Sequence, residues 1–87
     1  MTGLAPHITL TSTDDGTMVL NERTGRMFHL NDSGREALLA ALAGGTSAAA
    51  ERLRHRYGID DARARHDAEA ALAVLAAHGL IMEDGNR

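Results

Sequence analysis

Cysteine is absent from this 87-residue sequence, and its only aromatic residues are Phe28 and Tyr57. Without cysteine there is no disulfide framework, no thiolate zinc site and no cysteine nucleophile, which is compatible with a reducing cytoplasm. Because aromatic side chains are so few, the core has to consist of aliphatic residues, and either aromatic residue is available to contact a partner.

Long hydrophobic runs are also missing. No segment approaches about 20 consecutive apolar residues, so no transmembrane helix is predicted. The residues that follow Met1 have neither the basic start nor the apolar stretch of a secretion signal, and we therefore expect a cytoplasmic protein. The chain is long enough for one domain with a modest core and leaves little room for an enclosed catalytic pocket.

Patterns that would indicate catalysis or metal binding are not found. None of the five histidines lies three or four residues from another, the spacing that places two metal ligands on one face of a helix. No serine has the context of a nucleophile elbow, and the pairs Asp14–Asp15 and Asp60–Asp61 stand where turns and helix caps favour them. We expect no enzyme activity, no cofactor and no metal ion.

The charge pattern argues against nucleic acid as the main partner. The formal net charge is −3, and between residues 51 and 67 five arginines are offset by four acidic residues. Binding to a duplex depends on basic side chains that neutralise phosphates, and this segment has little excess positive charge. A winged-helix DNA-binding regulator remains as an alternative from another functional class.

The first third of the chain alternates apolar and polar residues with the period of a half-buried strand. Three strands are expected at residues 7–11, 17–21 and 26–30, joined by the turn signals Asp14–Gly16 and Glu22–Gly25. Turns this short connect neighbouring antiparallel strands. The segment is therefore predicted to form a three-stranded meander.

From Asn31 onward the hydrophobic period changes to that of a helix. Asn31, Asp32 and Ser33 are all favourable N-cap residues, and Ser33 with Glu36 fits a capping box. The first expected helix ends at Gly44–Gly45. A second helix is expected from Thr46 or Ser47 to Gly58 with Tyr57 facing inward, and a third from Asp60 to about His78. The predicted fold class is α+β and winged helix-turn-helix-like: a three-stranded antiparallel meander followed by three helices. We expect a flexible N-terminus at residues 1–6, one domain at residues 7–82 and a flexible tail at residues 83–87.

Residues 20–31 carry a pattern that resembles the PqqD-like family, in which a hairpin of the form L-x-x-x-T/S-G-x-x-x-x-L-N leads into the first helix. Residues 44–47 and 72–81 agree with the same family, so the similarity spans residues 10–82. The aromatic residue common in the first helix of these proteins is missing here, and Leu38 or Leu39 would fill its volume.

This resemblance implies a recognition element for ribosomally made precursor peptides. Such a domain binds the leader of the precursor as an added antiparallel strand against its third strand, beside its third helix. A stand-alone chain of this size is most similar to the leader-binding protein of lasso-peptide biosynthesis, which presents the leader to a separate transglutaminase-like leader peptidase; a cyclase is a further candidate partner. The close alternative is a PqqD-like peptide chaperone for a radical-enzyme pathway such as that of pyrroloquinoline quinone.

The expected binding site combines the exposed edge of the third strand with one side of the third helix, where small alanine side chains leave room for a peptide. Val74 lies off the expected core stripe of that helix and should be at least partly exposed. Because side chains alternate along a strand, Met27 and His29 share one face and Phe28 and Leu30 the other, and the sequence leaves open which pair meets the peptide. The candidate peptide-binding residues are Arg26, Met27, Phe28, His29, Leu30, Arg63, His66, Asp67, Ala70, Ala71 and Val74.

Overall fold

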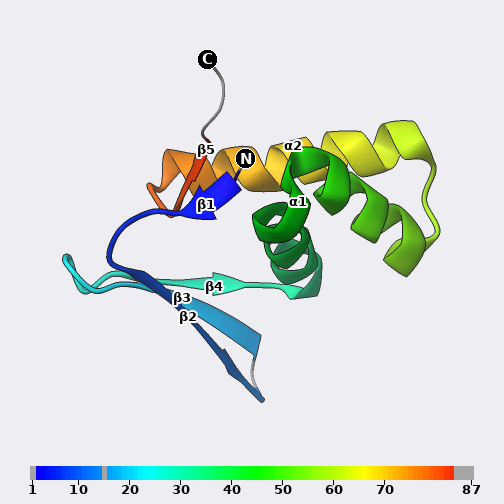
Figure 1. The fold of residues 1–87 in the computed structure, drawn as a ribbon. Coiled ribbons are helices and arrows are strands. Elements are labelled where there is room, and N and C mark those ends of the chain that lie inside the picture. The colour runs from blue at the N-terminus through cyan, green and yellow to red at the C-terminus, as the bar shows by residue number, and fades with distance from the viewer. Residues whose placement is uncertain (1, 15, 84–87) are drawn as a thin grey trace.

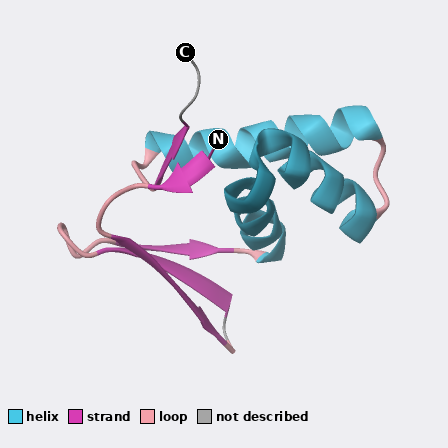
Figure 2. Cartoon of the chain, in the orientation of Figure 1, coloured by secondary structure: helices cyan, strands magenta, loops and turns pink. Residues whose placement is uncertain are grey.

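The computed structural model describes residues 2–14 and 16–83, and over these ranges the chain forms five strands and two helices (Figure 1). These elements form two antiparallel sheets, one with the strand order β2-β3-β4 and one made of β1 and β5. Figure 2 shows the larger sheet on one side of the helices and the small sheet beside the C-terminal end of α2. In chain order the elements are β1 (Thr2–Leu4), β2 (Ile8–Thr13), β3 (Gly16–Asn21), β4 (Met27–Leu30), α1 (Asp32–Tyr57), α2 (Asp61–Ala77) and β5 (Ile81–Glu83).

The expected antiparallel meander is present as β2, β3 and β4. Its register places Leu10 opposite Val19 and Val19 opposite Phe28, so these three side chains share the inner face of the sheet. The side chain of Asn21 organises the β3–β4 hairpin, because its Oδ1 accepts hydrogen bonds from the amides of Arg23 (3.0 Å) and Thr24 (3.3 Å). The alternating pattern and the turn residues therefore predicted this sheet correctly.

The prediction of a winged helix-turn-helix-like fold with three helices is wrong. Residues 32–57, which were expected to form two helices separated at Gly44–Gly45, belong to the single helix α1. Gly45 alone leaves helical geometry, with φ 82° and ψ −168°, a conformation that only glycine adopts without strain. The helix therefore bends at one residue and continues, where the glycine pair was expected to end it. The architecture is a compact α+β fold.

The small sheet joins the two ends of the described chain and was not predicted. Residues 2–4, within the expected flexible N-terminus, pair antiparallel with β5 so that Leu4 lies opposite Ile81. The amide of Ala5 extends this contact by donating to the carbonyl of Leu80 at 3.0 Å. The boundaries of the domain at residues 7–82 remain a prediction, and the expected tail at residues 83–87 lies, from residue 84 on, outside the described residues.

An ion pair connects the two halves of α1 on either side of Gly45. Asn31, and not Ser33, caps the helix, because its Oδ1 accepts from the amide of Gly34 at 2.8 Å. Glu36 therefore does not act in the expected capping box with Ser33. Its buried carboxylate lies 2.6 Å from Nε of Arg52, sixteen residues further along the chain. This hydrogen-bonded pair holds the bent helix in a fixed geometry.

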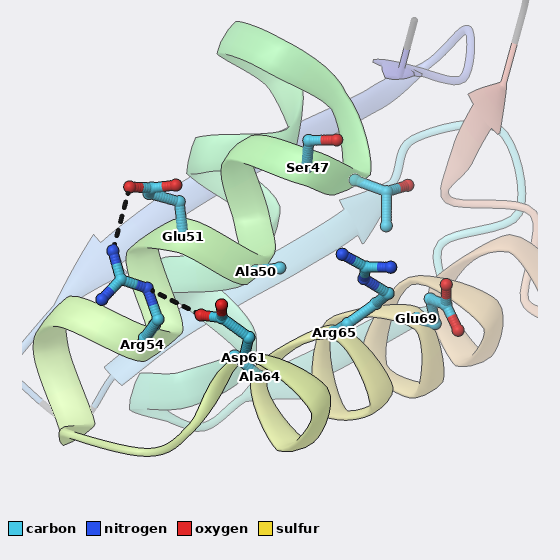
Figure 3. A pocket seen from close by; sticks show the side chains of 9 residues that line it. Ser47, Ala50, Glu51, Arg54, Asp61, Ala64, Arg65 and Glu69 are labelled. Atoms are coloured by element: carbon cyan, nitrogen blue, oxygen red, sulfur yellow. Dashed lines mark hydrogen bonds and ion pairs between the residues drawn. The ribbon is translucent and has the colours of Figure 1, made fainter.

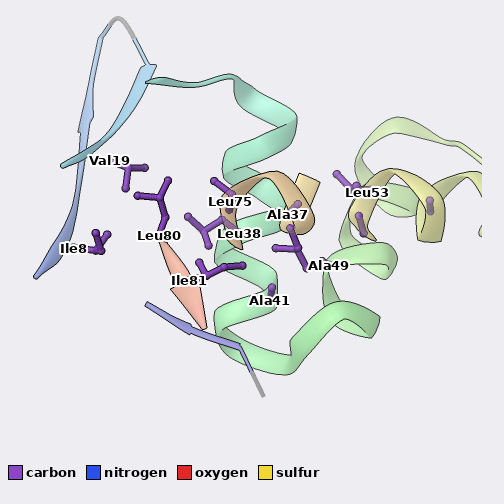
Figure 4. Close-up of a cluster of buried hydrophobic side chains, with 13 residues drawn as sticks. Ile8, Val19, Ala37, Leu38, Ala41, Ala49, Leu53, Leu75, Leu80 and Ile81 are labelled. Atoms are coloured by element: carbon purple, nitrogen blue, oxygen red, sulfur yellow. The ribbon is translucent and has the colours of Figure 1, made fainter. Parts of the chain in front are cut away.

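The core lies where the inner face of the meander, α1, α2 and β5 meet, and it is aliphatic as the composition requires (Figure 4). Leu38 is 1% exposed, whereas the next residue, Leu39, is 42% exposed, so Leu38 is the one that supplies volume to the core. Among the described residues no helix is long and apolar enough to cross a membrane. The buried apolar residues are Ile8, Val19, Ala37, Leu38, Ala41, Ala49, Leu53, Ala64, Ala68, Leu72, Leu75, Leu80 and Ile81.

Replacing Glu36 with glutamine tests the role of the ion pair in holding α1. The hydrogen bond from Arg52 holds the pKa of Glu36 below its ordinary value. The ionised carboxylate therefore stabilises the fold above the unfolded-state pKa, and this contribution is lost as the pH falls through the folded-state pKa. We expect Glu36→Gln to lower the free energy of unfolding by roughly 0.5–1.5 kcal/mol near neutral pH, since Arg52 remains half exposed.

Urea unfolding at neutral pH and in acid measures this effect, and the difference between the two proteins should shrink in acid. Glu51→Gln, at the exposed Glu51–Arg54 pair, is the matched control and should have a smaller effect. A stability difference for Glu36→Gln that does not change with pH would contradict an electrostatic role.

Candidate functional site

Strand β4 lies at the edge of the larger sheet. It pairs with β3, and no strand pairs with its other side in the part of the chain that the structure describes. The amide of Asn21 donates to the carbonyl of Arg26 at 2.9 Å, so residue 26 faces β3 through its backbone. Backbone direction alternates along an antiparallel strand, and the amide and carbonyl of Met27 therefore point away from β3. β4 thus offers a backbone edge to which another strand can be added.

The two faces of β4 differ in their surroundings. Phe28 and Leu30 are half-buried and pack against the core, whereas the side chain of Met27 is 60% exposed and His29 is exposed. Figure 1 shows β4 on the side of the meander that faces the helices. The structure therefore turns Phe28 and Leu30 toward α1 and α2, and Met27 and His29 toward solvent.

Phe28 links this strand to the end of α2. Its ring centroid lies 4.9 Å from that of His78, with an angle of 44° between the ring planes. Cζ of Arg26, the residue before β4, lies 5.7 Å from the centroid of the Phe28 ring, within the range of a cation–π contact. Phe28 thus contacts one residue that precedes its own strand and one at the end of α2.

A groove of about 500 Å³ lies between α1 and α2, and we call it the α2 groove. Ser33 lines it only three residues after the end of β4, so the groove opens beside the C-terminal end of that strand. Most of its lining is apolar or small, which leaves space for a side chain of a bound partner. The lining residues are Ser33, Leu53, Tyr57, Ile59, Arg63, Asp67, Ala70 and Ala71.

The charges in the α2 groove partly neutralise each other. Nε of Arg63 lies 3.6 Å from Oδ2 of Asp67, one helical turn further along α2. Both side chains are well exposed, so this pair contributes little to stability and can rearrange when a partner binds. Among the described residues no cluster of histidine, cysteine, aspartate and glutamate side chains could hold a metal ion.

Val74 lies on the same side of α2 as the groove. It follows Ala70 and precedes His78 by four residues each, the spacing that aligns side chains on one face of a helix. Its side chain is 56% exposed, whereas Leu72 and Leu75 are buried. The expectation that Val74 lies outside the core is confirmed, and Val74 shares one face of α2 with Ala70 and His78.

The structure does not bring every candidate residue together. Arg63, Asp67, Ala70 and Ala71 line the groove, but His66 lies with Arg65 and Glu69 on another face of α2. A rotation of about 100° per residue separates position 66 from position 67 and explains this difference.

Several residues at this site were not among the sequence-based candidates. Tyr57 was expected to face inward, yet it is 43% exposed and lines the groove. The sequence signal that could have identified Tyr57 is that it is one of only two aromatic residues in the chain. His78 could have been found from its spacing to Val74, whereas Ser33, Leu53 and Ile59 reach the groove only because α1 and α2 pack together.

A second hollow, of about 470 Å³, lies on the other side of α2 and differs in character (Figure 3). Arg54 pairs there with Glu51 at 3.2 Å and with Asp61 at 3.1 Å. Arg65 and Glu69 line the same hollow. None of the candidate peptide-binding residues lies in it, and its mixed charges separate it from the apolar groove.

Comparisons with known proteins agree with this architecture. No curated protein matches the chain. A solved structure of lasso peptide synthetase B1 complexed with the leader peptide has a TM-score of 0.86 and 26% sequence identity, over 94% of this chain and 98% of that one. A structure of TbiB1 in complex with the TbiA(beta) leader peptide has a similar fold, with a TM-score of 0.82 at 19% identity, over 95% of this chain and 98% of that one.

A protein-family comparison covers most of the sequence. The model described as coenzyme PQQ synthesis protein D (PqqD) matches residues 16–81, from the start of β3 to the first residue of β5. The match therefore includes the edge strand β4, both helices and the α2 groove. This chain belongs to the PqqD family.

Proposed function

We propose that this protein binds the leader segment of a ribosomally made precursor peptide, as an additional antiparallel strand on β4. The single observation that carries the proposal is the edge position of β4 beside the α2 groove. Two further findings support the same role: this chain belongs to the PqqD family, and its fold is similar to that of two proteins solved with leader peptides. Recognition of this kind, strand addition to an open sheet edge, uses backbone hydrogen bonds for pairing and pockets for selectivity.

Backbone pairing alone is too weak to hold a peptide. β4 has only four residues, so its outward-facing backbone can form only a few hydrogen bonds, each with a net value of about 0.5–1.5 kcal/mol. Ordering the peptide costs about 1–2 kcal/mol per residue in backbone entropy. The difference has to come from side-chain burial, at about 1.5–3 kcal/mol for each large apolar group. We assign this contribution to the α2 groove.

The proposed binding surface therefore has two parts. The strand part comprises Arg26 and β4, with Phe28 and Leu30 directed toward the helices. The helix part comprises the α2 groove and Val74. Tyr57 and Ile59 are added to the sequence-based candidates because they line the groove, and His66 is the candidate with the weakest structural support.

Presentation of the bound leader to a separate enzyme is the second half of the proposed role. A transglutaminase-like leader peptidase is the proposed partner, with a cyclase as a further one, and this chain itself is proposed to be non-catalytic. We place the encounter in the cytoplasm, where a ribosomally made precursor is first available. Lasso-peptide biosynthesis is preferred over a pyrroloquinoline quinone pathway because lasso peptide synthetase B1 is similar over nearly the whole chain.

Replacing Met27 with proline tests whether the peptide binds by strand addition. Proline lacks an amide hydrogen, and the amide of Met27 points away from β3, so the β3–β4 pairing should survive. We expect at least a tenfold loss of affinity, of the order that the loss of one or two hydrogen bonds produces. Fluorescence polarisation measures it with a labelled synthetic leader of a lasso-peptide precursor.

Met27→Ala is the control, because it shortens an exposed side chain and retains the amide. Equal affinities for the proline and alanine variants, with both proteins folded by circular dichroism, would refute strand addition at this edge.

Replacing Val74 with aspartate tests the helix part of the surface. A carboxylate at this position beside the groove would have to be desolvated by a bound peptide, so binding should be lost. Because Val74 is 56% exposed, the melting temperature should change little. Ala73→Asp, an exposed position on another face of α2, is the matched control and should bind normally. A collapse of the fold in Val74→Asp alone would show that Val74 supports the core.

A further inference from the structure

His78 lies at the C-terminal end of α2, and its side chain contacts Phe28 of β4. It is the C-terminal cap residue of α2, and its amide donates to the carbonyl of Val74 at 3.2 Å. Its exposed imidazole lies against the ring of Phe28 at a centroid distance of 4.9 Å. The side chain therefore bridges from the end of α2 to the edge strand β4.

Side chains make the direct contacts between α2 and β4. The backbone of α2 packs chiefly against α1 and β5, and that of β4 against β3 and α1. Phe28 and Leu30 of β4 pack against the core that contains Leu72 and Leu75 of α2. Within the described residues the Phe28–His78 ring contact is the aromatic link between the two elements, and it lies at the exposed residue His78.

Phe28 is also contacted by the residue that precedes β4. Cζ of Arg26 lies 5.7 Å from the Phe28 ring centroid, so the ring is contacted by a guanidinium group and by an imidazole. The side chain at position 78 is therefore one of the contacts that orient the Phe28 ring.

We infer that His78 is a positioning residue for peptide binding: its ring, packed on Phe28, sets the separation between the β4 edge and α2 that an incoming strand has to fit. This inference rests on the proposed function. His78 acts through Phe28, and the property it supplies is a flat ring at the end of α2. A side chain that keeps a ring at this position should therefore preserve binding, and a polar side chain of similar length without a ring should not.

The variants His78→Gln and His78→Phe separate these possibilities. We expect His78→Gln to weaken binding of the labelled synthetic leader by about threefold to tenfold, the range of an aromatic pair, while His78→Phe binds within about twofold of the unchanged protein. His55→Gln makes the same substitution at an exposed histidine of α1 outside the groove and is the matched control. Melting temperatures establish that each variant is folded.

A peptide-free measurement separates this inference from the proposed function. Phe28 is the only phenylalanine in the chain, so its ring protons are identifiable by nuclear magnetic resonance. They should shift in His78→Gln and not in His55→Gln. If the ring protons shift but no variant, nor the unchanged protein, binds the leader, the proposed function fails and the ring contact stands. If the unchanged protein binds and His78→Gln binds equally well, or if His78→Phe binds as poorly as His78→Gln, the positioning role is overturned.

Discussion

The open edge of β4 is the constraint on which the arrangement of this protein depends. The chain leaves the sheet at Leu30 and enters α1 at Asp32, with Asn31 as the cap between them. Because the next element is a helix and not a fourth strand, β4 keeps a neighbour on one side only in the described structure. An exposed edge normally invites uncontrolled pairing, and proteins protect or employ such edges. In the proposed binding mode, an incoming segment meets both this strand and the helices beside it.

In the proposed binding mode the helices provide selectivity, and their packing against each other and against β5 holds them in place. Glu36 and Arg52 fix the bend of α1 around Gly45, and the bend allows the second half of α1 to pack along α2. Tyr57 at the end of α1 then reaches the same groove as Ala70 and Ala71. An ion pair between residues sixteen positions apart is thus linked to the shape of this groove.

The small β1–β5 sheet has a related consequence for α2. It attaches the segment after α2 to the N-terminal strand, and Leu80 and Ile81 are buried there. The C-terminal end of α2 is therefore anchored, and His78 is presented to Phe28 from a fixed position. An unanchored helix end would fray and could not define a distance to a neighbouring strand.

The sequence by itself determined the local features of this protein. Its period-two alternation and turn residues specified the meander, the spacing of Val74 against Leu72 and Leu75 specified an exposed position, and the hairpin pattern at residues 20–31 specified the family. These properties depend on residues close together in the chain.

Only the tertiary structure decided the rest. Gly44–Gly45 was expected to end a helix, and in the structure helical geometry is interrupted at Gly45 and then resumes, with the Glu36–Arg52 pair joining the two halves from positions sixteen residues apart. β1 forms because β5 is available at the other end of the described chain, and Tyr57 is exposed because the packing of α1 on α2 leaves a groove there. Contacts between distant segments determine these outcomes, and local propensity carries no information about them.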